Sequence, residues 1–175
     1  AQSLEWYKLL KDRASTPERR QIAATGMLRS AAMSGNGEET ILAATAVLAD
    51  AKVAPELESE ARHYRSKALV EANQLAHAVA DWEALAKDTR NVYGAEAKYR
   101  LAQYLFDSGK TKEAEQEVLN YLEVSTPHAY WLARSFVLLS DIYAKLDRKL
   151  EARQYLLSLK QNYQADDDIA GMIES

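Results

Sequence analysis

The sequence predicts an all-helical fold built from repeated helical hairpins, and three observations carry this prediction. First, three prolines and six glycines are few for 175 residues, and both residue types disfavour the interior of a helix. Second, small residues recur at similar intervals along the chain. Third, each repeat contains a short sequence typical of a turn, which lies between two groups of apolar and small residues. Together these features indicate helix, turn and helix, repeated several times.

The composition is that of a folded globular chain, with 47% hydrophobic and 27% charged residues. The formal net charge is −4 and the pI is about 5.5, with acidic and basic residues interspersed, which argues against a nucleic-acid partner. The chain has no cysteine, so disulfides and thiolate metal sites are excluded. This absence suits both the cytosol and an oxidising periplasm.

No stretch of the sequence is long enough to predict a helix that crosses a membrane. The longest uncharged apolar run near a helix is Ile41 to Ala49, about half of the ~20 residues that a spanning helix needs.

The clearest repeat lies near the end of the chain. It contains Phe136, Leu139, Ser140 and Tyr143, followed by Ala152 and Leu156. Asp147 and Arg148 lie between these two groups, where the turn of a hairpin belongs. The spacing of the apolar and small residues predicts one helix on each side of that turn.

The same pattern recurs towards the N-terminus. Ala43, Ala78, Ala114 and Ala152 occupy the equivalent second-helix position, at successive spacings of 35, 36 and 38 residues. The turn residues are Gly35-Asn36-Gly37, Asn73, Gly109-Lys110 and Asp147-Arg148. Two helix backbones approach closely only where side chains are small, so we expect these alanines to lie inside the hairpins.

These residues resemble the tetratricopeptide pattern W-x2-L-G-x2-Y…A-x3-F, with Phe136 for Trp, Ser140 for Gly and Leu156 for Phe. The resemblance implies a right-handed superhelical solenoid that forms one domain over residues 1–175, as a fragment of a longer array. It places hairpins at 19–52, 56–88, 95–124 and 128–163, with flanking helices at 3–14 and 166–174. A non-repetitive helical bundle is the alternative fold.

The first helices depart from the family pattern at three positions. Lys98 and Arg62 stand where a bulky apolar residue is usual, and Arg65 stands where leucine is usual. These departures concern the register of the repeats rather than the existence of the hairpins.

The motifs of common enzymes are missing from the sequence. It contains no H-E-x-x-H pair, no G-x-S-x-G element and no glycine-rich phosphate loop. The acidic residues Glu38, Glu39 and Glu113 fall in first turns of predicted helices, where negative charge is favourable without any catalytic role. We therefore expect a protein without catalytic residues, metal or cofactor.

The resemblance to tetratricopeptide repeats implies that the first helices line a concave groove in which a partner binds. Carried over to this chain, the candidate binding residues are His63, Lys67, Tyr99, Gln103, Phe106, Arg134 and Asp141. Lys67, Gln103 and Arg134 offer hydrogen bonds, whereas His63, Tyr99 and Phe106 offer stacking area. The groove positions contain no asparagine, so the family's carboxylate clamp is incomplete.

The resemblance implies an interaction scaffold that binds a peptide or helix of another protein. The alternative is an oligomerisation or spacer segment of a larger multi-repeat protein. The sequence also resembles multi-repeat proteins of Gram-negative bacteria, which implies the periplasm or the outer membrane, with the cytosol as the other option.

The predicted N-terminal helix is apolar for an outer helix. It contains Leu4, Trp6, Tyr7, Leu9 and Leu10. We expect one side of it to cover the second hairpin and the other to form an apolar strip. Such a strip would favour self-association.

Overall fold

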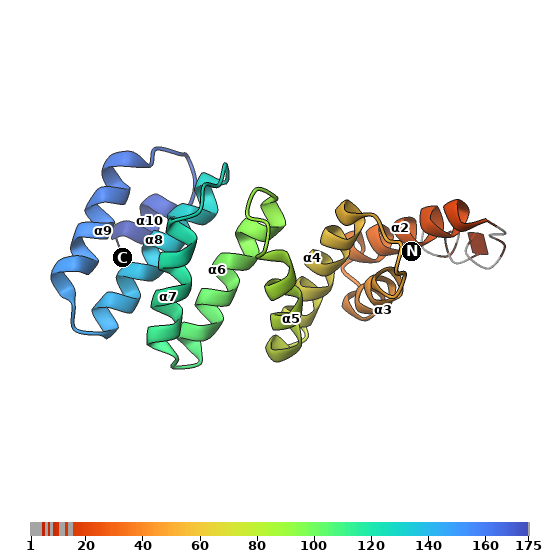
Figure 1. Ribbon diagram of the computed structural model, residues 1–175, viewed down its shortest axis with the longest axis horizontal. Coiled ribbons are helices and arrows are strands. Elements are labelled where there is room, and N and C mark those ends of the chain that lie inside the picture. Colours follow the sequence, from red (N-terminus) through yellow and green to blue (C-terminus); the bar gives the residue numbers. More distant parts are fainter. Residues whose placement is uncertain (1–4, 6, 8, 11–12, 14–15, 175) are drawn as a thin grey trace. The chain divides into compact units, whose positions relative to one another are not determined.

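The computed structural model describes residues 5, 7, 9, 10, 13 and 16–174. Of these residues 77% are helical and none lies in a strand, which confirms the all-helical prediction. The helices are α2 (Pro17–Met33), α3 (Gly37–Leu48), α4 (Pro55–Glu71), α5 (Leu75–Leu85), α6 (Val92–Asp107), α7 (Thr111–Leu122), α8 (Ala129–Lys145), α9 (Lys149–Asn162) and α10 (Ile169–Glu174) (Figure 1). The described residues within 3–14 are helical as well.

The chain divides into two compact units, Ala1–Trp82 and Glu83–Ser175, and each is described by itself below. In the first unit, α3 packs against both α2 and α4. In the second unit, α7 packs against α6 and α8, α9 packs against α8, and α10 packs against α8 and α9. Helices that follow one another in sequence therefore pack together. The prediction of one continuous domain stays a prediction.

The second helices α3 and α5 end three or more residues earlier than predicted, and an aspartate forms a turn after each of them. α3 ends at Leu48, and Asp50 accepts the backbone amide of Lys52 at 2.9 Å, which starts a turn. α5 ends at Leu85, and Asp88 accepts the amide of Arg90 in the same way.

The two largest differences between predicted and observed helix starts are at α6 and α10, and a side-chain cap accounts for each. α6 begins at Val92 rather than at 95, because the Asn91 side chain accepts the Tyr93 amide at 2.9 Å. The terminal helix α10 begins at Ile169 rather than at 166. The Asp167 side chain accepts the Ile169 amide at 3.0 Å, so the aspartates form the cap rather than the first turn.

Each hairpin turn contains one residue with a left-handed backbone. The φ angles are 68° at Gly35, 57° at Asn73, 77° at Gly109 and 60° at Asp147. The turn before α9 shows the shared hydrogen bonds: the Asp147 amide donates to the Ala144 carbonyl at 3.1 Å, and the Arg148 amide donates to the Tyr143 carbonyl at 2.8 Å. This pair of bonds ends the first helix of every hairpin.

The small residues of the repeat are buried, as the register predicted. Ala43, Ala78, Ala114 and Ala152 on the second helices are between 0% and 7% exposed. Their partners on the first helices are small and buried too: Ala31, Ser66, Ala102 and Ser140. Small side chains are thus buried on both helices of each hairpin.

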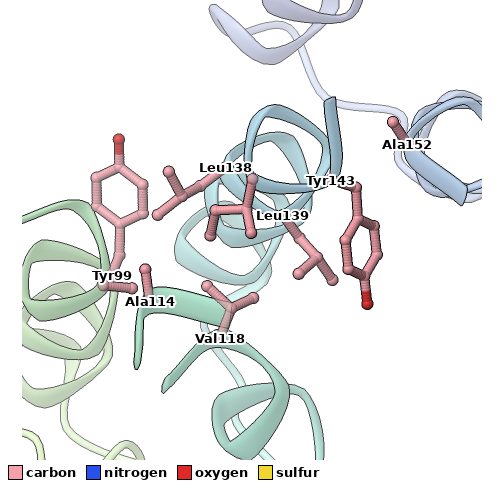
Figure 2. Close-up of a cluster of buried hydrophobic side chains, with 9 residues drawn as sticks. Tyr99, Ala114, Val118, Leu138, Leu139, Tyr143 and Ala152 are labelled. Atoms are coloured by element: carbon pink, nitrogen blue, oxygen red, sulfur yellow. The ribbon is translucent and has the colours of Figure 1, made fainter. Parts of the chain in front are cut away.

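The core of the second unit lies between α6, α7, α8 and α9. Leu138 and Leu139 project from α8 towards Tyr99 of α6 and Val118 of α7 (Figure 2). Burial of these leucines stabilises the unit by about 1.5–3 kcal/mol each.

The N-terminal half of α8 belongs to a separate, smaller cluster, which contains Ala133 of α8, Leu159 of α9 and Ile169 of α10. The helix α10 therefore closes the C-terminal side of the second unit.

The core of the first unit contains Leu28 of α2, Val47 of α3 and Leu57 of α4. Gly26 lies beneath the ring of Tyr7, and a β-carbon at this position would overlap the ring atoms. The predicted N-terminal helix therefore contacts α2 through Tyr7. The predicted residues Leu4 and Trp6 lie outside the described residues, and self-association stays a prediction.

The charged residues that depart from the tetratricopeptide pattern form ion pairs with the second helix of the same hairpin. Lys98 of α6 pairs with Glu117 of α7 at 2.9 Å. Arg62 and Arg65 of α4 both pair with Asp81 of α5, at 3.2 and 2.7 Å, and the Asp81 side chain is only 1% exposed. A charged residue on one helix is thus neutralised by an opposite charge on the next.

Candidate partner-binding surface

The first unit contains a hollow of about 820 Å³ on its first helices α2 and α4. We name it the α2–α4 groove and define it by Glu18, Ile22, Arg29, Met33, Glu56 and Glu60. Tyr7 and Gly26 also lie in its wall. A hollow of this size falls within the range of protein ligand sites.

A bidentate ion pair joins α2 to α4 within the groove. Arg29 of α2 donates from Nε to Oε1 of Glu60 and from Nη2 to Oε2, both at 2.7 Å. The Glu60 side chain is 12% exposed and that of Arg29 is 56% exposed, so the pair is anchored on α4 and open to solvent on α2. These two charges neutralise each other within the groove.

Apolar side chains lie on both sides of that ion pair. Ile22 is 60% exposed and Met33 is 88% exposed, and both line the groove. A large apolar side chain in water gains free energy when a partner covers it. The groove therefore combines exposed apolar area with charges that are already paired.

In the second unit, the structure brings together three of the residues predicted to bind a partner. Arg134 of α8 donates from Nη2 to the Tyr99 hydroxyl at 2.9 Å, and that hydroxyl donates to Oε1 of Gln103 at 3.1 Å. Gln103 in turn donates from Nε2 to Asp107 at 2.9 Å. These bonds join α6 to α8 on one face of the unit.

The ring of Tyr99 is buried, at 5% exposure, so it is packed inside the unit rather than presented to a partner. Its centroid lies 5.7 Å from that of Trp131 and 5.0 Å from the guanidinium carbon of Arg134. What Tyr99 contributes to this face is the hydroxyl that holds Arg134 in place.

The guanidinium of Arg134 is held by hydrogen bonds to several side chains. Besides the bond to Tyr99, its Nη1 donates to the Tyr130 hydroxyl at 3.2 Å and to Asp168 at 3.1 Å. Burial acts to lower the pKa of Arg134, but the hydrogen bonds with Tyr99 and Tyr130 outweigh it and raise the pKa above its ordinary value. Asp168 comes from the segment before α10, so the chain itself supplies the charge that faces Arg134.

Phe106 and Asp141 lie on the same two helices but outside that network. Phe106 is half-buried and packs against the core, which leaves part of its ring for contact. Asp141 is exposed and makes no ion pair with any described residue. Nevertheless, partial burial of the carboxyl raises its pKa.

His63 and Lys67 of the first unit lie on α4. The His63 ring is tilted against Tyr64, with centroids 5.4 Å apart. Lys67 is exposed and lines a small hollow of about 230 Å³ together with Tyr64 and Glu71. Neither residue is among those that line the α2–α4 groove.

Most of the residues that shape the α2–α4 groove were not predicted from the sequence. The family's binding positions were assigned only from the second hairpin onwards, so none of them lies on α2. A signal was present, because Ile22, Gly26, Arg29 and Met33 follow one another at spacings of four, three and four and share one face of a helix. Trp131, which stacks beside Tyr99, was missed as well.

Neither a metal site nor a membrane span occurs in the described part of the chain. No group of three or more histidine, aspartate or glutamate side chains there could hold a metal ion. Likewise, none of the described helices combines the length and apolar character that a membrane crossing requires.

Comparison with protein-family models, with curated proteins and with solved structures found no match for this chain.

Proposed function

We propose that the chain is a tetratricopeptide-like solenoid that binds a segment of another protein along its first helices, without catalysing a reaction. The proposal rests on the repeated hairpins and, above all, on one observation: the α2–α4 groove exposes Ile22 and Met33 beside an ion pair that is already neutral. Contact surfaces of this kind gain affinity from apolar anchors, whereas charged groups among them fix the orientation of the partner.

The second unit supports the same function with a different surface. Arg134 is fixed by Tyr99 and Tyr130, so its position costs little side-chain entropy when a partner contacts it. Gln103 and Phe106 lie on the neighbouring helix α6. A first-helix surface with an ordered arginine and an accessible aromatic edge suits protein recognition.

Site-specific photo-crosslinking in the cell of origin tests this function. A crosslinking amino acid at Ile22, in the groove, is expected to capture a discrete partner. The same amino acid at Leu42, which is 61% exposed on the second helix α3, is the matched control. Capture at Leu42 but not at Ile22 would show that the partner binds elsewhere.

Substitutions in the groove then distinguish specific binding of a partner from chance crosslinking. Ile22→Glu is expected to abolish the crosslink formed from a probe at Thr25, whereas Leu42→Glu leaves it unchanged. For the second unit, Arg134→Ala tests the polar contact, and Tyr99→Phe removes only the buried hydroxyl. Tyr99→Ala is unsuitable because deleting a buried ring destabilises the unit itself.

The alternative, an oligomerisation or spacer segment, is favoured by one observation. Leu150 and Leu157 of α9 are 80% and 46% exposed, and their spacing of seven residues places them on one face. If this face joins copies or neighbouring repeats, the purified chain will associate in light scattering and Leu150→Ser with Leu157→Ser will restore a monomer.

A further inference from the structure

The charges of the α2–α4 groove do not balance among the described residues. Its charged lining consists of Glu18, Arg29, Glu56 and Glu60. Arg29 and Glu60 neutralise each other through two hydrogen bonds of 2.7 Å. Glu18 and Glu56 remain, and neither forms an ion pair with a described residue. The groove therefore presents two carboxylates that no basic side chain of its described lining contacts.

Both carboxylates lie at the start of a helix. Glu18 lies in the first turn of α2 and Glu56 in the first turn of α4, where the partial positive charge of a helix N-terminus favours a carboxylate. Hydrogen bonds from the Glu18 backbone and from the Thr16 side chain lower the pKa of Glu18. A favourable position at a helix start is reason enough for Glu18 and Glu56 to be acidic. Both residues nevertheless also line the α2–α4 groove.

The distance between the exposed apolar side chains sets the length of a partner that covers both of them. Ile22 and Met33 are eleven positions apart on α2, which corresponds to roughly 16 Å along a helix. A partner that covers both must carry apolar groups about three helical turns apart and must also contact the Tyr7 ring, which lies over Gly26 between them. This length corresponds to a helix of about 12–15 residues.

The polar groups of the groove favour a helical partner over an extended one. An extended peptide needs hydrogen-bond partners for its backbone, whereas a helix satisfies its own. In the groove, the Thr25 hydroxyl already donates to the Gln21 carbonyl at 2.8 Å, and Arg29 and Glu60 are already bonded to each other. These side chains are therefore already bonded within the chain and do not serve an extended backbone.

We propose that the α2–α4 groove receives an amphipathic helix of a partner protein, with an apolar face over Ile22 and Met33 and with lysine or arginine side chains opposite Glu18 and Glu56. This inference rests on the proposed function and adds the chemistry of the partner to it. Apolar contact supplies the affinity, and the two carboxylates select a basic helix over an acidic one.

Defined peptides test the inference without knowledge of the natural partner. The probe is a fluorescein-labelled amphipathic helix of about 15 residues, with leucines on one face and lysines beside them. A second peptide carries glutamate in place of every lysine. Binding to the 175-residue chain is measured by fluorescence anisotropy at physiological salt.

The lysine peptide is expected to bind and the glutamate peptide is not. The double variant Glu18→Gln with Glu56→Gln should weaken binding of the lysine peptide by about three- to tenfold, as expected for two exposed ion pairs. The matched control is Glu113→Gln with Glu123→Gln, which removes the same net charge at exposed positions outside the groove and should leave the affinity unchanged. Circular dichroism of each variant confirms that the helices persist.

The remaining outcomes separate this inference from the proposed function. If both peptides bind equally well and Ile22→Ser weakens both, the groove binds a helix but the charge selection is wrong. If the control pair weakens the lysine peptide as much as the groove pair, the attraction is general and the inference is overturned. If neither peptide binds, the inference is overturned too, while crosslinking at Ile22 decides the proposed function independently.

Discussion

The Ser140 hydroxyl of α8 donates a hydrogen bond to the backbone carbonyl of Ala152 in α9, at 3.1 Å. A side chain as short as serine reaches a carbonyl on the neighbouring helix only if the two backbones are close. Both residues are buried, at 5% and 7% exposure. This contact explains why the hairpin requires small residues at both positions.

Ala152→Leu and Ala114→Leu are therefore expected to destabilise the second unit by about 1–3 kcal/mol each, because the added atoms have no space between the helices. The measurement is the midpoint of urea unfolding. Ala144→Leu, at an exposed position of α8, is the control and should leave the midpoint nearly unchanged. An unchanged midpoint for both buried variants would contradict the register of the hairpins.

The turn glycines allow a test of backbone conformation alone. At Gly109, with a φ of 77°, a β-carbon would meet no atom within 4 Å, so Gly109→Ala adds no clash. The left-handed backbone still makes alanine unfavourable there by about 1–2 kcal/mol. Gly171→Ala also meets open space but lies in the helix α10 without a positive φ, so it should be neutral or stabilising. Thermal unfolding of the two variants compares them directly, and equal effects would contradict the turn geometry.

The sequence was sufficient to predict the hairpins because their determinants are local and repeated. Gly109 and Asp147 end helices through bonds to residues within one turn, and Ala114 and Ala152 recur at a nearly constant interval. Such features depend on the chain near each residue. The larger differences in helix bounds occur where an aspartate or asparagine side chain forms an additional turn or cap.

The proposed binding surface was harder to predict because it depends on contacts between distant residues. Tyr99 occupies a groove position of the family pattern, yet Trp131 and Arg134 of another helix enclose its ring. In the same way, Arg29 meets Glu60 across 31 positions of sequence. Only the packing of the first helices shows which candidate side chains stay accessible.

The buried carboxylate of Asp81 provides a prediction about ion pairs. It accepts hydrogen bonds from Arg65 at 2.8 and 2.7 Å and from Arg62 at 3.2 Å. Asp81→Asn removes the charge but keeps the shape, so two arginines lose their common partner. We expect a loss of about 3 kcal/mol in the free energy of unfolding. Chemical denaturation measures it, with the exposed Glu83→Gln as the control; equal stability of both variants would show that the buried pairs contribute nothing net.

Asp141 provides a prediction about pH. Partial burial raises its pKa in the folded protein, so the folded state binds the proton more tightly than the unfolded chain does. Ionisation therefore costs folding free energy above the raised pKa, and that cost disappears as the pH falls below the ordinary pKa of aspartate. Asp141→Asn should be more stable than the parent at neutral pH and equally stable in acid.

The urea midpoints of the parent and Asp141→Asn, measured across that pH range, check the sign. The exposed Asp166→Asn serves as the comparison, and its difference from the parent should not grow with pH in this way. If Asp141→Asn is instead less stable than the parent at neutral pH, the ionised carboxyl has a favourable partner in solution and the prediction is wrong.

The contact between Arg134 and Asp168 predicts how α10 is held. Asp168 immediately precedes α10 and accepts from Arg134 at 3.1 Å, with its side chain 51% exposed. Asp168→Ala removes the ion pair but leaves the apolar cluster of Ile169 intact, so the loss should be about 0.2–1 kcal/mol. The backbone amides of α10 should then exchange with deuterium a few times faster, which mass spectrometry measures. Asp166→Ala, with an exposed side chain, should not change the exchange, and an equal effect of both variants would show that Arg134 does not anchor the helix.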